Sequence, residues 1–224
     1  MSKRFALLAA AAAVALVAGA AAPIAAAEMS EKTVNVGGAP MYPSKNIIQN
    51  AVNSKDHTTL VAAVKAAGLV DTLQGPGPFT VFAPTNEAFA KLPAGTVDNL
   101  LKPENKAMLV KVLTYHVVPG RMTAASLMKA VKDGEGAAKL KTVEGEDIWV
   151  KQAGPGKLTI TDSKGDVAMV TIADVMQSNG VIHVIDVLCG YALAGGKNLD
   201  QRDTVAQQGL VGRAIAALRR RHLA

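Results

Sequence analysis

Cysteine, histidine and aromatic residues are scarce in this sequence. The 224 residues include one cysteine, Cys189, so neither an internal disulfide nor a cysteine-based zinc site can form. Aromatic residues make up only 4% of the chain. The four histidines lie far apart, without the spacing of metal ligands, at His57, His116, His183 and His222. The sequence therefore predicts no metal site.

The motifs of common enzyme classes are also missing. Neither G-x-S-x-G, the Walker A loop, G-x-G-x-x-G nor H-E-x-x-H occurs. Ser126-Leu127-Met128-Lys129 matches the S-x-x-K element of penicillin-binding enzymes, but Val143 follows Lys141-Thr142 where that class needs a glycine. A four-residue match with two free positions is more simply an exposed helix. We expect a protein that is not an enzyme and needs no cofactor.

The body of the chain has no excess of either charge. The net charge of the whole sequence is +6, yet residues 28–196 hold 16 Lys+Arg and 16 Asp+Glu. The excess lies in the first residues and in the last 28, which include Arg219, Arg220 and Arg221. Nucleic-acid binding needs a basic surface, so we expect no nucleic-acid partner for the body.

The N-terminus has the pattern of a signal peptide. A basic head at Lys3-Arg4 precedes a continuous apolar run from Phe5 to Val17, and small residues at Ala25-Ala26-Ala27 suit a cleavage site. We expect residues 1–27 to be removed on export, leaving a periplasmic, secreted or cell-surface protein. The alternative is an uncleaved anchor, because the apolar region approaches the length that spans a bilayer.

Two further segments flank the expected domain, residues 44–190. Residues 28–43 contain Gly37-Gly38 and two prolines, and we expect an exposed lead-in. Residues 191–224 form a basic tail in which Val211, Ile215 and Leu218 share a helical face. Such a tail could contact an anionic membrane, although an extension without a role is the simpler interpretation. Cys189 could pair between chains if accessible, or be inert if buried.

The pattern between these segments predicts helices first and β-hairpins later. Ser44 and Asp56 are candidate N-caps for two helices, the second ending at Gly68. Thr85 is a candidate cap after a buried strand at 79–83. Further helices are expected at 86–92, 97–101, 103–113 and 124–131, and strands at 114–118, 139–143, 148–152, 157–161, 167–172 and 181–188. Helices in the first half and hairpins in the second predict an α+β domain.

Acidic residues gather at the turns between these hairpins. Asp162 and Asp166 flank one turn, and Glu144–Asp147 forms another. Carboxylates at such positions usually accept hydrogen bonds from turn backbone, and weak calcium binding is the alternative.

Three distinctive segments are FTVFAPTNEAF at 79–89, YHVVPG at 115–120 and NGVIHVIDVL at 179–188. Together these segments resemble the fasciclin domain family of secreted and surface-attached adhesion proteins. The resemblance spans roughly Ser44 to Leu188. In its short, exported, single-domain form the chain is similar to bacterial members of the family. It implies a wedge of two β-sheets with flanking helices. It assigns structural roles to Phe79, Phe82, Pro84, Thr85, Asn86, Phe89, Asn179, Gly180, His183 and Asp186.

The resemblance implies binding rather than catalysis. Family members mediate attachment between cells or to matrix, so the expected partner is a cell-surface or matrix component bound through protein or glycan contacts. The segments that carry binding in animal members correspond here to Tyr115, His116, Asp174, Val175 and Met176, with Ile172-Ala173 in place of the family's Glu-Pro. A structural interpretation of Tyr115-His116 stays open, as strand residues with a buried, hydrogen-bonded ring.

A second function is open on the same resemblance. Some fasciclin proteins hold an apolar ligand such as a carotenoid between helices and loops, which would make this chain an extracytoplasmic binder of a small apolar molecule. The sequence alone shows no feature that demands such a ligand.

Overall fold

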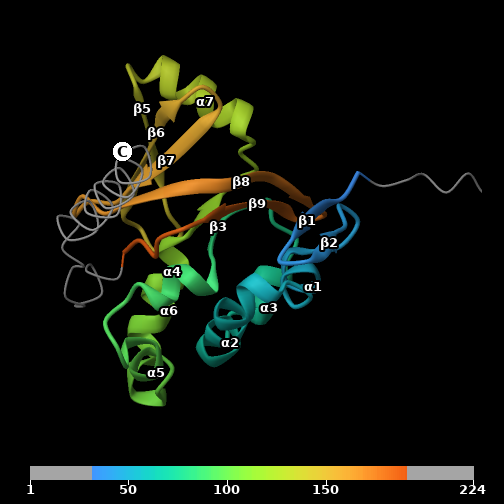
Figure 1. The fold of residues 1–224 in the computed structure, drawn as a ribbon, viewed down its shortest axis with the longest axis vertical. Helices are drawn as coiled ribbons and strands as arrows, with labels where there is room; N and C mark the ends of the chain where they lie inside the picture. The colour runs from blue at the N-terminus through green and yellow to red at the C-terminus, as the bar shows by residue number, and fades with distance from the viewer. Residues whose placement is uncertain (1–31, 191–224) are drawn as a thin grey trace, which may run out of the picture. The chain divides into compact units, whose positions relative to one another are not determined.

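The computed structural model describes residues 32–190, which contain short helices and two groups of strands (Figure 1). The α-helices are α1 (Ile47–Ala51), α2 (Thr58–Ala67), α3 (Val70–Gln74), α4 (Asn86–Ala90), α5 (Thr96–Leu100), α6 (Lys106–Tyr115) and α7 (Ala124–Asp133). Two 3-10 turns, η1 (Lys55–His57) and η2 (Pro103–Asn105), precede α2 and α6. The strands are β1 (Val34–Val36), β2 (Ala39–Met41), β3 (Phe79–Pro84), β4 (Val117–Pro119), β5 (Ala137–Lys141), β6 (Asp147–Gly154), β7 (Lys157–Thr161), β8 (Val167–Gln177) and β9 (Gly180–Ile185).

Seven of the strands form one hydrogen-bonded series in the order β4-β3-β9-β8-β7-β6-β5. β3 and β9 pair in parallel, and the other neighbours are antiparallel. The 11-residue β8 pairs with β7 through residues 167–169 and with β9 from Val170 to Gln177, with register shifts between Val170 and Val175. Bulges of this kind bend a strand, so β8 is shared by the two sheets of the wedge. The α+β fold class expected from the sequence is confirmed.

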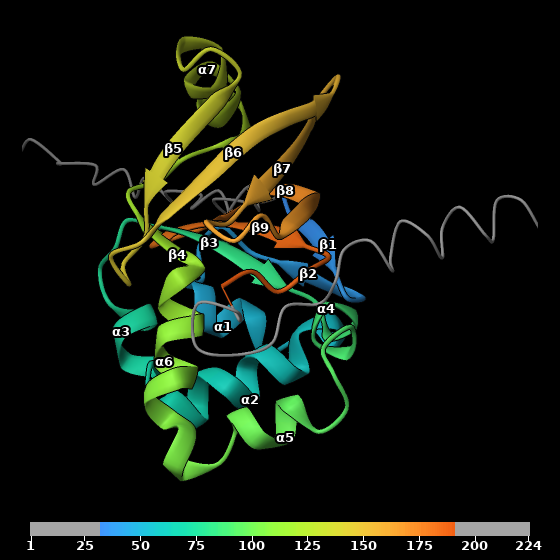
Figure 2. The same cartoon turned by 90° about the vertical axis from the view of Figure 1, so that its left-hand side faces the viewer.

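Two large apolar cores lie on the two sides of this sheet system, and a third, small cluster surrounds Phe89. The helices α1, α2, α3 and α6 pack on one side of β3 and β9 (Figure 1). The single helix α7 packs against β5 and β6 on the other side, over Leu158 and Ile160 of β7 (Figures 1 and 2). Strand β3 supplies both cores, because Val81 faces the first and Phe82 the second.

The parallel start of β3 and β9 depends on two glycines. A Cβ atom on Gly180 would lie 2.2 Å from the Phe79 carbonyl oxygen, and one on Gly77 would lie 2.1 Å from that of Asn179. Gly77 also has φ +58°, a conformation that glycine adopts without the strain of a side chain. These contacts set the register Phe79↔Gly180 that runs on to Pro84↔Ile185.

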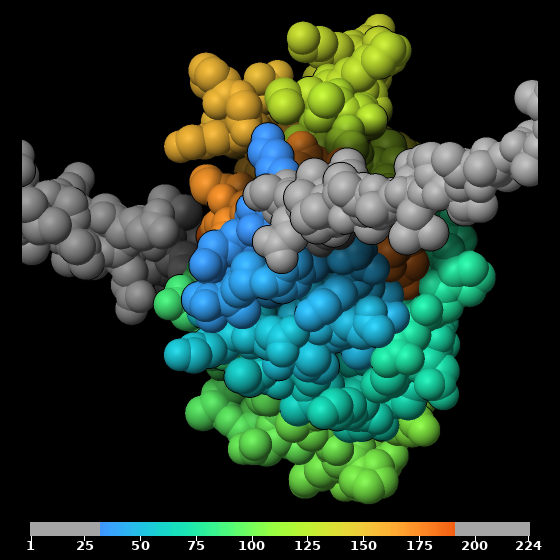
Figure 3. All heavy atoms as spheres, turned by 90° about the vertical axis from the view of Figure 1, so that its right-hand side faces the viewer, coloured from blue at the N-terminus to red at the C-terminus, as the bar shows by residue number. Residues whose placement is uncertain are grey.

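The expected exposed lead-in is wrong for residues 34–41. β1 and β2 form an antiparallel hairpin, and the side chains of Val36 and Met41 are only 2% and 3% exposed. Figure 3 shows this N-terminal segment (blue) lying against the helices that follow it. The inward-facing Val34, Val36, Ala39 and Met41 flank the exposed Asn35 and Pro40, and three-residue strands are too short for that alternation to stand out in the sequence.

Several expected element ends also differ. Asn46, not Ser44, caps α1, and its side chain forms a capping box with Gln49. Residues 55–57 form a 3-10 turn, so α2 begins at Thr58 and Asp56 is not its N-cap. Tyr115 is the last residue of α6 rather than part of a strand, which leaves 117–119 as β4. β-Branched residues in 114–118 favoured a strand, but packing of the helical face decides the boundary.

The remaining strand limits are close to expectation. β7 has the expected bounds, whereas β8 continues past Ile172 to Gln177 and β9 ends at Ile185 instead of residue 188. The predicted signal peptide and the tail lie outside the described residues. Among residues 32–190, no helix is long and apolar enough to cross a membrane.

Candidate functional site

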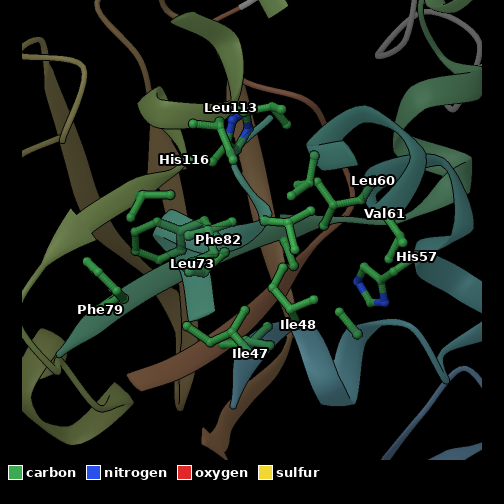
Figure 4. Close-up of a pocket in the computed structure, with 18 of the residues that line it drawn as sticks. Ile47, Ile48, His57, Leu60, Val61, Leu73, Phe79, Phe82, Leu113 and His116 are labelled. Carbon is green, nitrogen blue, oxygen red and sulfur yellow. The ribbon is translucent and has the colours of Figure 1, made fainter. Parts of the chain in front are cut away.

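An apolar cavity of about 80 Å³ lies between the helical layer and β3. Figure 4 shows side chains of α1, α2 and α3 facing those of β3 across it. The walls are formed mainly by apolar groups, among them Ile47, Ile48, Leu60, Val61, Leu73, Phe79 and Leu113. Helical periodicity is consistent with burial of Ile47, Leu60 and Leu113, but it does not show that the packed side chains leave a space between them.

The cavity is small for a ligand. An engineered cavity of about 150 Å³ lined by aliphatic and aromatic residues is large enough for benzene, and apolar cavities of this kind stay dry. The volume here is about half of that. A molecule of that size therefore fits only if the helices move apart slightly, and an extended one needs the helical layer to open.

His57 brings one polar group to this cavity. Its ring is 3% exposed, and Nδ1 lies 2.9 Å from the Ser54 hydroxyl. Among the described residues, Nε2 of His57 is the one buried side-chain nitrogen or oxygen without a hydrogen bond. Burial lowers the pKa of His57, and the nearby Ala83 carbonyl offsets part of this effect without meeting hydrogen-bond geometry. The ring is therefore neutral near pH 7.

His116 also lines the cavity, and both of its ring nitrogens are paired. Nδ1 lies 2.8 Å from the Val112 carbonyl, which can only accept, so Nδ1 carries the proton. Nε2 then accepts from the backbone N–H of Cys189 at 3.2 Å. Burial lowers the pKa of His116 to about 4. This neutral ring joins the end of α6 to the segment after β9.

Tyr115 points to the opposite core. Its ring is 2% exposed among the residues under α7, and its hydroxyl donates to the Asp147 carbonyl at 3.0 Å. Burial, the largest cause, raises the pKa of Tyr115. Neither Tyr115 nor His116 presents a side chain at the surface. The structural interpretation left open by the sequence accounts for both residues, with the difference that they end a helix instead of lying in a strand.

The second predicted binding segment lies at the bulge of β8. Asp174 has φ 58°, and its carboxylate accepts from the Ala124 N–H at 2.7 Å, at the start of α7. Val175 is 1% exposed and lines the cavity, as His116 does. Met176 is half-buried. Val175 and His116 thus both line the cavity, whereas the Asp174 carboxylate hydrogen-bonds to the first residue of α7.

His183 joins the same bulge to the loop before α7. Its Nε2–H donates to the Met122 carbonyl at 2.9 Å, so Nδ1 accepts from the Asp174 N–H at 3.3 Å. The ring stacks on Phe82 with centroids 5.6 Å apart. Burial lowers the pKa of His183. The polar atoms of this ring are used within the fold.

Other residues of the three family-like segments also bind neighbouring backbone. Thr85 caps α4 by accepting from the Ala88 N–H at 3.2 Å. Asn86 accepts from the Thr59 N–H at 3.0 Å and donates to the Lys55 carbonyl at 2.8 Å, which ties α4 to the start of α2. Phe89 is buried near α6, and Asp186 accepts from the Met169 N–H at 2.7 Å.

Asn179 fixes the start of the parallel pair. It accepts from the Ile47 N–H at 3.0 Å and donates to the carbonyls of Leu73 and Gly75 at 2.8 and 2.9 Å. One side chain therefore joins α1, the end of α3 and β9. The buried pair Asn50–Gln177 reinforces the same corner. No sequence motif marks that pair, because its partners are 127 residues apart.

Asp162 holds the end of the described chain, next to Cys189, by accepting a hydrogen bond from Gly190. Oδ1 of Asp162 accepts from the N–H groups of Lys164 and Asp166, both at 2.9 Å, and Oδ2 accepts from Gly190 N–H at 3.0 Å. The expected turn role of Asp162 is confirmed. Cys189 is 1% exposed, and burial raises the pKa of its thiol. Of the two alternatives for Cys189, the buried and unreactive thiol is therefore the one that the structure shows.

Metal ligands do not gather at any of these places. Within residues 32–190 no three side chains of His, Cys, Asp or Glu are grouped so that they could hold a metal ion. The site is an apolar interior, and the paired polar groups around it hydrogen-bond to loops and helix ends.

Comparison with known proteins places this fold. The family model described as Fasciclin domain matches residues 55–189, more than half of the chain. A Synechocystis protein, sll1483, is 50% identical over 167 residues, which cover 73% of this chain and 84% of that protein. The cell surface glycolipoprotein MPB83 of Mycobacterium bovis is 33% identical over 155 residues, covering 60% of this chain and 69% of the relative.

A solved structure agrees at the level of fold. The domain pair of the insect cell adhesion molecule Fasciclin I superposes with a TM-score of 0.58 at 19% identity, covering 71% of this chain and 58% of that one. At this identity the likeness shows the fold alone.

Proposed function

Since the chain belongs to the fasciclin domain family, we propose that it is an exported adhesion protein that attaches cells to one another or to surfaces. The observation that carries the proposal is the match over residues 55–189, which includes all three family-like segments from β3 to the end of β9. Two similar proteins are named as a cell surface glycolipoprotein and a cell adhesion molecule. The proposed partner is a protein or glycan of the cell surface or matrix, and the proposal includes no reaction.

A deletion strain tests this role. We expect the strain to attach less to a surface and to form weaker biofilm, and the full chain supplied in trans should restore both. The matched control is the chain without residues 1–27, which should fail to restore attachment because it stays inside the cell. Unchanged attachment of the deletion strain would contradict the proposal.

A second candidate function is binding of a small apolar molecule. The cavity beneath α1 and α2 supports it, because its wall is almost wholly apolar and the one buried polar side-chain atom without a partner among the described residues is Nε2 of His57. A carotenoid is too large for a cavity of about 80 Å³, so that ligand would require the helical layer to open.

Extraction of the purified chain tests this candidate. An organic extract analysed by mass spectrometry should contain a lipid-soluble compound, and a coloured preparation would identify a carotenoid. The control is Val61→Phe, which fills the cavity and should reduce the extracted amount. A colourless protein without extractable ligand would contradict this second function.

A further inference from the structure

The strands β5, β6, β7 and the start of β8 carry a solvent-facing surface on the side opposite α7. Alternate residues of a strand point to opposite faces, and Ile148, Val150 and Leu158 fill the core under the helix. Their neighbours in sequence therefore face outward. Figure 1 shows α7 on one side of these strands, and Figure 2 looks onto the other side.

The strand register gathers lysines around the single tryptophan on that outer side. Lys139 pairs with Trp149, and Trp149 with Thr161. In the next row, Lys151 pairs with Thr159. The lysine–tryptophan face consists of Lys139, Lys141, Trp149, Lys151 and Lys157.

The charges of this face are available to a ligand. Asp147 is the acidic residue between these lysines, at 3.0 Å from Lys139 and 3.7 Å from Lys141. Those two lysine side chains are 61% and 68% exposed, and ion pairs at such exposure contribute little. Lys151 and Lys157 are exposed and have no ion pair within residues 32–190. The face therefore offers four cations against one carboxylate, although the body as a whole is neutral.

Trp149 adds an apolar plane in the middle of these charges. It is half-buried, with the Lys139 ammonium 6.0 Å from its ring centroid. Met169, at the β8 side of the face, is 41% exposed. Thr159 and Thr161 of β7 lie between Trp149 and that apolar side, in register with Met169 and Val167 of β8. The combination suits a partner with flat apolar faces, hydroxyl groups and spaced negative charges.

We propose that the lysine–tryptophan face binds an acidic polysaccharide, a polymer of sugar rings that carry carboxylates. Its rings stack their C–H faces on Trp149, while their carboxylates contact Lys139, Lys151 and Lys157. This names a chemical class for the glycan partner and rests on the adhesion function proposed above.

Edge protection and nucleic-acid binding fit the face less well than an acidic polysaccharide does. Lysines on an edge strand discourage unwanted strand pairing, and β5 is such an edge, but Trp149, Lys151 and Lys157 lie on the inner strands β6 and β7. Single-stranded nucleic acid stacks successive bases on several aromatic side chains, whereas this face has one.

Binding of the purified chain to immobilised polygalacturonate tests the proposal. Fully methyl-esterified polygalacturonate is the matched polymer, because it keeps the rings and loses the charges. We expect binding to the acidic polymer that weakens with added salt, since exposed charges are screened. The esterified polymer should bind much more weakly.

Three variants locate the site. Lys139→Gln/Lys151→Gln should weaken binding by roughly five- to ten-fold, as two exposed ion pairs would predict. Trp149→Ala should weaken it roughly ten-fold through lost stacking, with the unfolding midpoint checked by circular dichroism. Lys102→Gln/Lys132→Gln makes the same charge change at exposed positions beside η2 and on α7, and should leave binding unchanged.

Three outcomes would overturn the proposal. They are equal binding of both polymers, an equal loss in the Lys102/Lys132 variant, and equally tight single-stranded DNA binding that Trp149→Ala does not affect.

Attachment of cells expressing the same variants separates the two proposals. If the deletion strain attaches poorly but face variants restore it fully, adhesion stands and the polysaccharide site fails. If deletion changes nothing while polymer binding follows the variants, adhesion fails and the site stands.

Discussion

Buried histidine rings give the domain a defined response to acid. His116 is held neutral, with one ring nitrogen donating to Val112 and the other accepting from Cys189. Its pKa of about 4 in the folded protein lies below the ordinary value of 6.5. A group of this kind stabilises the fold fully above its unfolded pKa, and the stabilisation is lost as pH falls toward the folded pKa.

We therefore expect the free energy of unfolding to fall between pH 6.5 and about 4. The loss from His116 amounts to about 1.4 kcal/mol per pH unit and about 3 kcal/mol in total. Urea unfolding at a series of pH values measures it. His116→Gln should lower stability at pH 7 and remove about one proton from this slope. A slope equal in wild type and variant would show that His116 does not contribute.

Asp162 shows how one carboxylate can hold a turn and a chain segment together. Asp162→Asn puts an amide N–H opposite one of three backbone donors, so we expect a loss of about 2 kcal/mol in unfolding free energy. Asp166→Asn is the matched control. Burial and then the charge of Asp162 raise the pKa of Asp166, so its neutralisation should be harmless or slightly stabilising. Equal losses in the two variants would contradict this account.

At the scale of elements, local signals in the sequence located most helices and strands. Thr85 and Gly68 marked real helix ends, and the 157–161 strand has the expected bounds. The β1–β2 hairpin was not predicted, because its burial depends on contacts with β8 rather than on its own sequence pattern. The cavity was not predicted for a similar reason, because it arises where the packed elements do not fill the space between them. The lysine–tryptophan face was not identified from the sequence, because only the register brings the alternating residues of 139–141 and 147–151 together.

Asn179 joins elements that are far apart in sequence, and its removal should loosen them together. Asn179→Ala leaves the Ile47 N–H and the Leu73 and Gly75 carbonyls without their partner, so we expect a loss of about 2–4 kcal/mol. Asn53→Ala, which removes one exposed hydrogen bond to the Gln49 carbonyl of α1, should change stability by about 0.5 kcal/mol or less.

Hydrogen exchange gives this prediction a local readout. The Ile47 amide should exchange faster in Asn179→Ala than in Asn53→Ala, under conditions where global unfolding is corrected for. Unchanged protection of Ile47 would mean that backbone packing, and not Asn179, fixes the start of α1.

At the scale of the molecule, the described domain has two large cores but one sheet system. The helical layer covers β3 and β9, α7 covers β5 and β6, and β8 pairs into both sheets. Phe82 and Val81 are adjacent on β3 and face different cores. Loss of either core exposes one side of strands that the other core also needs. Partial unfolding of one core is therefore unfavourable.

This arrangement predicts a single cooperative unfolding transition. Fluorescence of Trp149 reports on β6, whereas circular dichroism at about 222 nm reports mainly on helices, most of which lie in the other layer. The two signals should give the same midpoint in urea. Leu127→Ala in the α7 core and Leu109→Ala in the helical-layer core should each cost about 2–5 kcal/mol and shift both signals equally. If Leu127→Ala moves only the fluorescence midpoint, the shared strands do not couple the cores, and the two layers unfold as separate units.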